Sequence, residues 1–215
     1  MGLAFHYSAC IRKQELIKPL VTEVEDICQS MNWEYTLWDK VSEFPATSIP
    51  KEPGTGDPKS IHLQGILFTP PECETVSLLF TPSGRMTAFP NLLSAESYVV
   101  NGLDIDLIYT VSVKTQYAGV DLHIALMNLL KYLEGKYLTD MEVSDEGEYW
   151  ERMDKNYLAE RFAANWAVIN AVKDALSNAE FKSDRNADTI SDQLLAILRK
   201  KLGDGFENKT LDNTD

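Results

Sequence analysis

Carboxylates and aromatic rings gather between residues 139 and 154, in the segment TDMEVSDEGEYWERMD. Such a segment could bind calcium, so we compared it with the twelve-residue EF-hand loop, placing Gly147 at the conserved glycine. This register puts Glu142 and Glu146 at ligand positions, but it puts Met153 where the loop needs a bidentate Glu. The segment is therefore not an EF-hand.

Two aromatic residues beside acidic ones provide apolar anchors with a charged rim, a combination that concentrates binding energy at protein interfaces. We therefore predict a docking surface made of Asp145, Glu146, Glu148, Tyr149 and Trp150. Three other interpretations stay open. The first is a solvated connection, and the second is a loose divalent-cation site. In the third, the ring of Trp150 packs into the core. Solvent exposure of the two rings would decide.

A metal site on a polar sheet face is the alternative source of chemistry. Asp104 and Asp106 alternate with apolar residues, as in a strand with one wet face, and paired carboxylates at that spacing can hold Mg²⁺ or Mn²⁺. His6 and His62 could line the same wet face. The sequence has no glycine-rich phosphate loop, so a solubilising role competes with this interpretation.

Nucleophilic catalysis has little support, and no cofactor is expected. His6 and Cys10 are the closest nucleophile and base, but four residues of strand separate them by about 13 Å, far beyond a hydrogen bond. His123 has no histidine four residues away to form a helical metal pair, so we expect a packed or capping role for it.

Hydrophobic periodicity predicts the elements that would position these residues. Strands are expected at 3–7, 33–38, 61–70, 75–82, 84–89 and 103–117, with a hairpin turn at Ser83 and Gly84. Helices are expected at 14–31, 120–137, 156–178 and 189–202. The stripes of the first two helices are Leu16, Leu20, Val24, Ile27 and Met31, and Leu122, Leu126, Leu129, Leu133 and Tyr137. Residues 40–60 are proline-rich and predict a long loop.

This order of elements predicts an α+β fold. We expect an antiparallel sheet of about five or six strands from residues 2–117, with helices packed largely on one face and a C-terminal helical appendage. The corresponding parts are a core domain at 1–155, C-terminal helices at 156–202 packed on or beside it, and a flexible tail at 203–215.

Composition restricts the function. The net charge of −13 disfavours direct nucleic-acid binding and anionic membranes, although many acidic proteins have ordinary roles. Three scattered cysteines and no signal peptide or apolar span favour a cytoplasmic location. We therefore predict a non-catalytic cytoplasmic protein that binds another macromolecule, such as a basic protein, through acidic and aromatic surface. The alternative is a small metal-assisted hydrolase or nucleotide-handling enzyme using the polar sheet face; the oligomeric state stays open.

Overall fold

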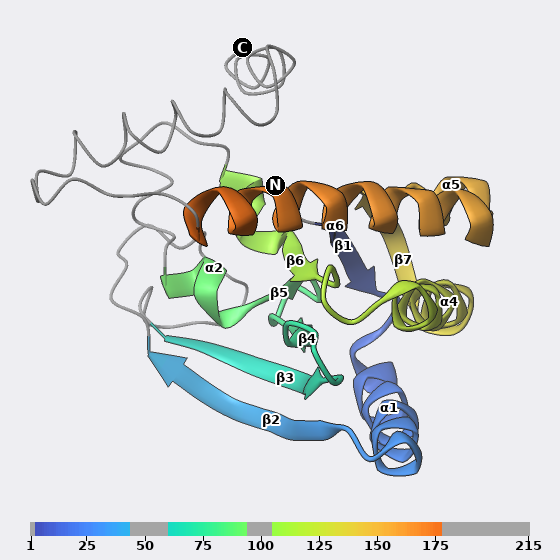
Figure 1. Cartoon of the computed structure of the whole chain (residues 1–215). Helices are drawn as coiled ribbons and strands as arrows, with labels where there is room; N and C mark the ends of the chain where they lie inside the picture. Colours follow the sequence, from blue (N-terminus) through green and yellow to red (C-terminus); the bar gives the residue numbers. More distant parts are fainter. Residues whose placement is uncertain (1–2, 44–59, 94–104, 178–215) are drawn as a thin grey trace, which may run out of the picture. The chain divides into compact units, whose positions relative to one another are not determined.

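The computed structural model describes residues 3–43, 60–93 and 105–177 (Figure 1). The chain divides into two compact units, residues 1–162 and residues 163–215. The first unit contains both sheets and most of the described helices. The predicted α+β class with antiparallel pairing is confirmed. The expected helix at 189–202, the tail at 203–215 and most of the 40–60 loop lie outside the described residues.

A three-stranded antiparallel sheet has β1 (Ala4–Ile11) at its centre, between β6 (Val111–Lys114) and β7 (Leu138–Asp145). Phe5 lies opposite Val113 on one side and Asp145 on the other. The side chains of β1 alternate as predicted, because Phe5, Tyr7 and Ile11 are buried while polar residues between them keep partial exposure.

A four-stranded antiparallel sheet follows the order β2 (Glu34–Glu43), β3 (Ser60–Thr69), β4 (Val76–Phe80) and β5 (Met86–Thr87). Gly84 adopts a φ of +86° in the turn before β5, as the predicted hairpin requires. Its carbonyl accepts a hydrogen bond of 2.9 Å from Ile11 N–H, which joins the two sheets.

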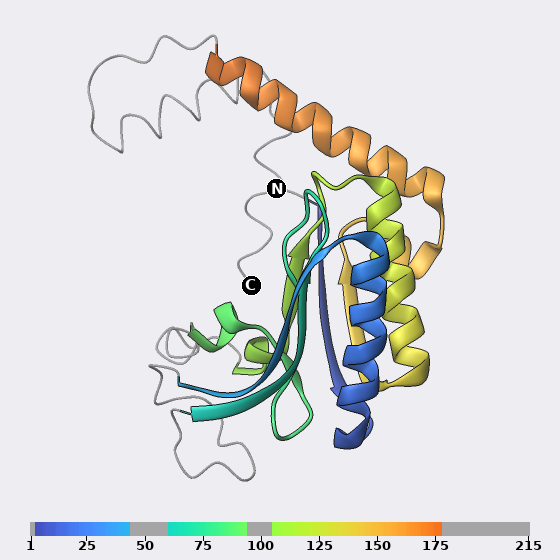
Figure 2. The same cartoon turned by 90° about the horizontal axis from the view of Figure 1, so that it is seen from below.

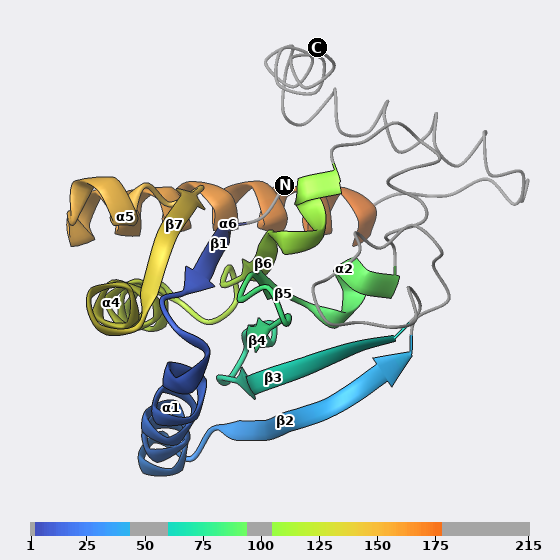
Figure 3. The ribbon, with the colours of Figure 1, turned by 180° about the vertical axis from the view of Figure 1, so that it is seen from behind.

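Within the described residues, seven helical elements lie between these strands or follow the last of them. They are the 3₁₀ turns η1 (Gln14–Leu16) and η2 (Ile105–Tyr109), the longer helices α1 (Ile17–Met31), α4 (Val120–Lys136) and α6 (Lys155–Ser177), and the short helices α2 (Phe89–Leu93) and α5 (Tyr149–Arg152). Figures 2 and 3 show α1 and α4 side by side. The part of α6 through Phe162 belongs to the first unit, where Leu158 and Phe162 are buried.

The main core is formed by the three-stranded sheet, strands β3 and β4 of the four-stranded sheet, and helices α1 and α4. Its largest contributors include Phe5, Tyr7, Leu20, Phe68, Leu126 and Leu133. Trp33 stacks on Phe68 with 5.9 Å between ring centroids, which anchors the start of β2. A second cluster, around Leu63, Leu92 and Ile108, fills the space beneath α2 and η2.

Two segments adopt a different secondary structure from the one predicted. Residues 138–145 form a strand rather than a loop; Asp140 and Glu142 are exposed on it, whereas Asp145 at its end is buried. Residues 105–109 form a 3₁₀ turn rather than the start of a strand; there Ile108 and Tyr109 are both buried although they are adjacent, which an alternating strand does not permit. The expected single sheet of residues 2–117 therefore becomes two sheets, the smaller completed by β7.

Candidate functional site

Asp145, the first residue of the predicted docking surface, points into the protein. Its side chain is fully buried, and its carboxylate accepts backbone hydrogen bonds from Gly147 at 2.8 Å, Tyr149 at 2.8 Å and Trp150 at 3.1 Å. These N–H groups lie in the turn after β7 and at the start of α5. N–H groups at such positions have no backbone acceptor within the helix. Asp145 therefore fixes the connection between β7 and α5.

His123 on α4 completes this buried network. Its Nε2 lies 3.1 Å from the carboxylate of Asp145, and its Nδ1 lies 2.7 Å from the hydroxyl of Thr115. An ionised carboxylate can only accept, so Nε2 carries a proton that it donates to Asp145. The ring also makes edge contacts with Phe5 and Phe162. His123 is therefore packed, as predicted, although it is hydrogen-bonded on both sides.

The arrangement of Thr115, His123 and Asp145 has the composition of a nucleophilic triad but not its accessibility. All three side chains are buried, and the Thr115 hydroxyl also lies 3.4 Å from the carbonyl of Leu3. Burial raises the pKa of Asp145, but the hydrogen bond from His123 and those from the backbone outweigh it, so the pKa lies below its ordinary value. The network is thus an ionised structural cap with no substrate access.

The other residues of the predicted docking surface differ in exposure. Tyr149 is buried, with 7% of its surface accessible, and Trp150 is half-buried beneath Lys131, whose ammonium lies 4.2 Å from its ring. Glu146 accepts a hydrogen bond of 2.8 Å from the Ala4 N–H, while Glu148 binds Arg152 at 2.6 Å. The five residues thus do not form one continuous open surface.

The two histidines of the metal alternative lie on strands of different sheets. His6 lies on β1 opposite Ser112 and Ser144, whereas His62 lies on β3 in the other sheet, 2.9 Å from Asp39. Asp104 is outside the described residues, and the side chain of Asp106 is too. In the part of the chain that the structure describes, no three His, Cys, Asp or Glu side chains are grouped to hold a metal ion.

A small polar cleft of about 280 Å³ lies on the exposed face of the three-stranded sheet, beside Cys10, Arg85, Asp140 and Glu142. The pairing of β1 and β7 shifts register between Ser8 and Cys10. Burial and the neighbouring carboxylate of Asp140 raise the pKa of the Cys10 thiol. This raised pKa opposes thiolate formation, so the cleft lacks an activated nucleophile.

A wider groove of about 650 Å³ lies between α1 and α4, and its lining is mostly apolar. Ile27 and Met31 contribute from α1, and Ala125, Leu129 and Tyr132 contribute from α4. Met31 is 55% exposed and Tyr132 is 46% exposed. Side chains of both helices are therefore left open to solvent on a surface that also carries the carboxylate of Asp26.

The helix periodicity explains why the groove forms. Both predicted apolar stripes exist, and their central members, such as Leu20, Val24, Leu126 and Leu133, fill the core. Each stripe is wider than the core can cover, so Ile27 and Leu129 are only half-buried and Met31 is exposed. The sequence predicts both stripes, but it does not show which of their residues the core leaves uncovered.

One end of the groove is closed by Glu23. Its carboxylate binds the Lys136 ammonium at 2.8 Å and accepts hydrogen bonds from the hydroxyls of Tyr132 and Tyr137. The hydrogen bond with Lys136 contributes most to lowering the pKa of Glu23, to about 2. The ring of Tyr132 is thereby held at the groove margin in a fixed orientation, which lowers the conformational entropy lost on binding.

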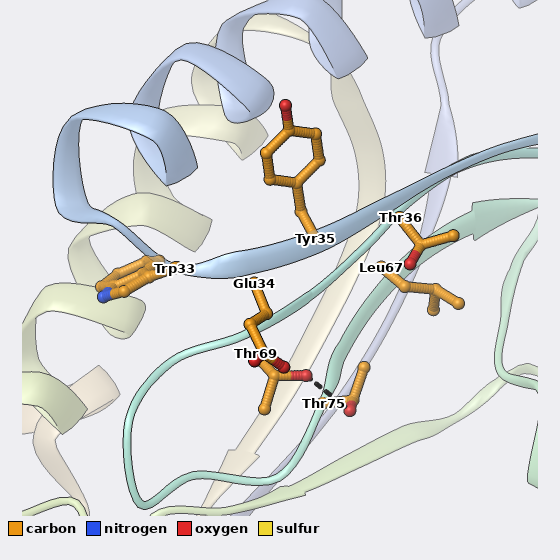
Figure 4. Close-up of a pocket in the computed structure, with 7 residues that line it drawn as sticks. All are labelled: Trp33, Glu34, Tyr35, Thr36, Leu67, Thr69 and Thr75. Carbon is orange, nitrogen blue, oxygen red and sulfur yellow. Dashed lines mark hydrogen bonds between the residues drawn. The ribbon is translucent and has the colours of Figure 1, made fainter.

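Figure 4 shows a third hollow, of about 560 Å³, where β2 begins and β3 ends. Glu34, Thr36 and Leu67 line it, and the hydroxyls of Thr69 and Thr75 are 2.8 Å apart at its edge. Tyr35 points to the opposite side of β2 (Figure 4). Glu34 and Tyr35 are the ionisable residues that line it, and the Tyr35 hydroxyl is hydrogen-bonded to Glu25 and Gln29 on α1, so the two do not form an acid and base pair.

No protein-family model, no curated protein and no solved structure matches this chain. Among the described residues, no helix is both long enough and apolar enough to cross a membrane.

Proposed function

We propose that this protein is a non-catalytic binding protein whose groove between α1 and α4 receives an amphipathic helix of another protein. The observation that supports the proposal is the accessible apolar lining contributed by α1 and α4, since a groove between two helices can receive the apolar face of a partner helix. The proposal keeps the class of function that the sequence predicts. It transfers the binding surface from residues 145–150 to the groove.

Charge selects the kind of partner helix. Asp26 lines the groove and is exposed, and in the described part of the chain its carboxylate has no ion-pair partner. The net charge of −13 adds a negative field around the whole molecule, which attracts positive ligands and repels negative ones. We therefore expect a partner helix whose apolar face is flanked by Lys or Arg.

The groove also has the chemistry of a binding site rather than an enzyme site. Its polar lining residues besides Glu23 and Asp26 are Ser30 and Asn128, with Tyr132 held by its hydrogen bond to Glu23. No His or Cys lines it. Apolar anchors surrounded by a polar rim concentrate the free energy of association in a few side chains.

A labelled model peptide provides the test. We expect a 14-residue amphipathic Leu/Lys helix to bind with a Kd on the order of 10 μM by fluorescence anisotropy, and a Leu/Glu peptide of equal length to bind much more weakly. Ala125→Arg fills the groove and should weaken Leu/Lys binding at least about tenfold. Ala159→Arg is the matched control, since Ala159 is also an exposed helical alanine but lies outside the groove.

Both substitutions add one positive charge, so a general electrostatic effect would weaken binding equally in the two variants. Equal affinities for Ala125→Arg and Ala159→Arg would contradict the groove as the binding site. Failure of the wild-type protein to prefer the Leu/Lys peptide over the Leu/Glu peptide would contradict the partner chemistry.

A further inference from the structure

One edge of strand β2 is not paired with any described strand. The strand lies at the end of the four-stranded sheet, where its ten residues pair with β3 on one side, and no described strand pairs with its other side (Figure 1). Leu37 is 49% exposed and Val41 is 63% exposed. Edges of this length attract further strands, and natural proteins usually protect them with charged side chains, proline, bulges or short length; Lys40 is the one lysine on β2. The pairing of β2 with β3 is continuous from Glu34 to Glu43, without a bulge.

Symmetry limits how two copies of β2 could pair. Two antiparallel strands of one sheet are related by a two-fold axis perpendicular to that sheet, which keeps each side chain on its own face. Directly opposed residues share a face, and faces alternate along a strand. The residue numbers of each opposed pair must therefore add to an even number. This condition excludes full overlap of the strand, which would pair Glu34 with Glu43.

One of the allowed registers is self-complementary. With Leu37 opposite Leu37 of the second copy, Glu34 lies opposite Lys40, and by symmetry this pair forms twice. A shift that centres Asp39 places like charges together. A shift that centres Trp38 leaves Glu34 opposite Ser42 and Lys40 opposite Thr36. Opposite-charge and apolar cross-strand pairs stabilise a sheet, and like-charge pairs destabilise it.

We infer that two copies of this protein associate through their β2 edges, with Leu37 on the two-fold axis and Glu34 paired with Lys40 of the other copy. Both charged side chains are exposed in the single chain, where the Lys40 ammonium lies 3.8 Å from the ring centroid of Trp38 and would exchange that contact for the pairing with Glu34. The dimer would join two four-stranded sheets into one continuous sheet of eight strands, and it would cover the exposed side chain of Leu37. It uses a different surface from the α1–α4 groove.

Charge reversal tests the register. Glu34→Lys and Lys40→Glu each convert two attractive pairs into two repulsive ones, and either should raise the dimer Kd by about tenfold in analytical ultracentrifugation. The double variant Glu34→Lys/Lys40→Glu restores opposite charges and should return the Kd to within about threefold of wild type. The inference is wrong if the dimer Kd of the double variant is raised by the product of the two single-variant increases. It is also wrong if the wild type stays monomeric up to millimolar concentration.

Cross-linking tests the position of the axis. Opposed residues of antiparallel strands have Cα atoms about 4.5–5.5 Å apart, within the range of a disulfide. Leu37→Cys should therefore form an intermolecular disulfide on mild oxidation, whereas the matched variant Val41→Cys, on the same face and also exposed, should not. A cross-link through Val41→Cys alone would overturn the register. Circular dichroism melting checks that each variant is folded, and Ala125→Arg should leave the dimer unchanged.

Discussion

The segment at 145–150 and the α1–α4 groove both combine carboxylates with large apolar or aromatic side chains, but they orient them differently. In the segment, Asp145 and Tyr149 are buried and the carboxylate is saturated by hydrogen bonds. In the groove, Met31 and Tyr132 are exposed and Asp26 faces solvent. Composition alone therefore does not distinguish an interface from a buried structural network such as that of Thr115, His123 and Asp145, which we call the internal brace. What distinguishes them is whether the polar atoms already have partners within the chain.

Removal of the internal brace should have the largest effect on stability. We expect Asp145→Ala to lower the free energy of unfolding by about 4 kcal/mol, because three backbone N–H groups and the proton on His123 Nε2 would lose their acceptor in a buried position. Urea unfolding followed by circular dichroism measures this. Glu142→Ala is the control, since Glu142 is exposed on the same strand and its loss should cost no more than about 0.5 kcal/mol. A loss below about 1 kcal/mol for Asp145→Ala would show that the network does not brace the fold.

Some of this brace follows from the sequence. An Asp before a Gly and a short helix is a recognisable cap, because its carboxylate can reach N–H groups two to five residues later. The partnership with His123, twenty-two residues earlier, depends on how β7 and α4 pack and has no local signature. Strand β7 was missed for a related reason. Met141 and Val143 alternate with Asp140, Glu142 and Ser144 as in a strand, but this pattern is short, and the pairing with β1 that fixes it is distant in the sequence.

The groove shows a different limit of sequence reasoning. Periodicity located both helices to within three residues at each end, because the apolar stripes are long and regular. It does not state how much of each stripe the opposing sheet covers. That amount depends on the spacing between α1 and α4, which tertiary packing sets. Exposure of Met31 could therefore not be inferred from its place in the stripe.

Acid should affect the brace in a predictable direction. The pKa of Asp145 is lowered in the folded state, so its ionised form contributes stability above the unfolded value of about 3.9, and this contribution is lost as the pH falls through the folded pKa. We expect Asp145→Asn to be less stable than wild type at pH 7, and the difference to shrink steadily below about pH 4. Urea unfolding at several pH values measures the difference. A difference that is constant down to pH 2 would contradict a lowered pKa of Asp145 in the folded protein.

The smallest effect on stability, at a position where binding should nevertheless weaken, is expected from Met31→Lys. Met31 is the last residue of α1 and is 55% exposed, so Lys there should alter the free energy of unfolding by no more than about 0.5 kcal/mol. The same change places a positive charge and a flexible chain in the groove, which should weaken Leu/Lys peptide binding about fivefold or more. Met153→Lys is the matched control, because Met153 is 49% exposed and lies outside the groove. If both lysine variants bind the peptide alike, exposed apolar side chains at the groove do not mark an interface, and the contrast with the buried brace loses its functional meaning.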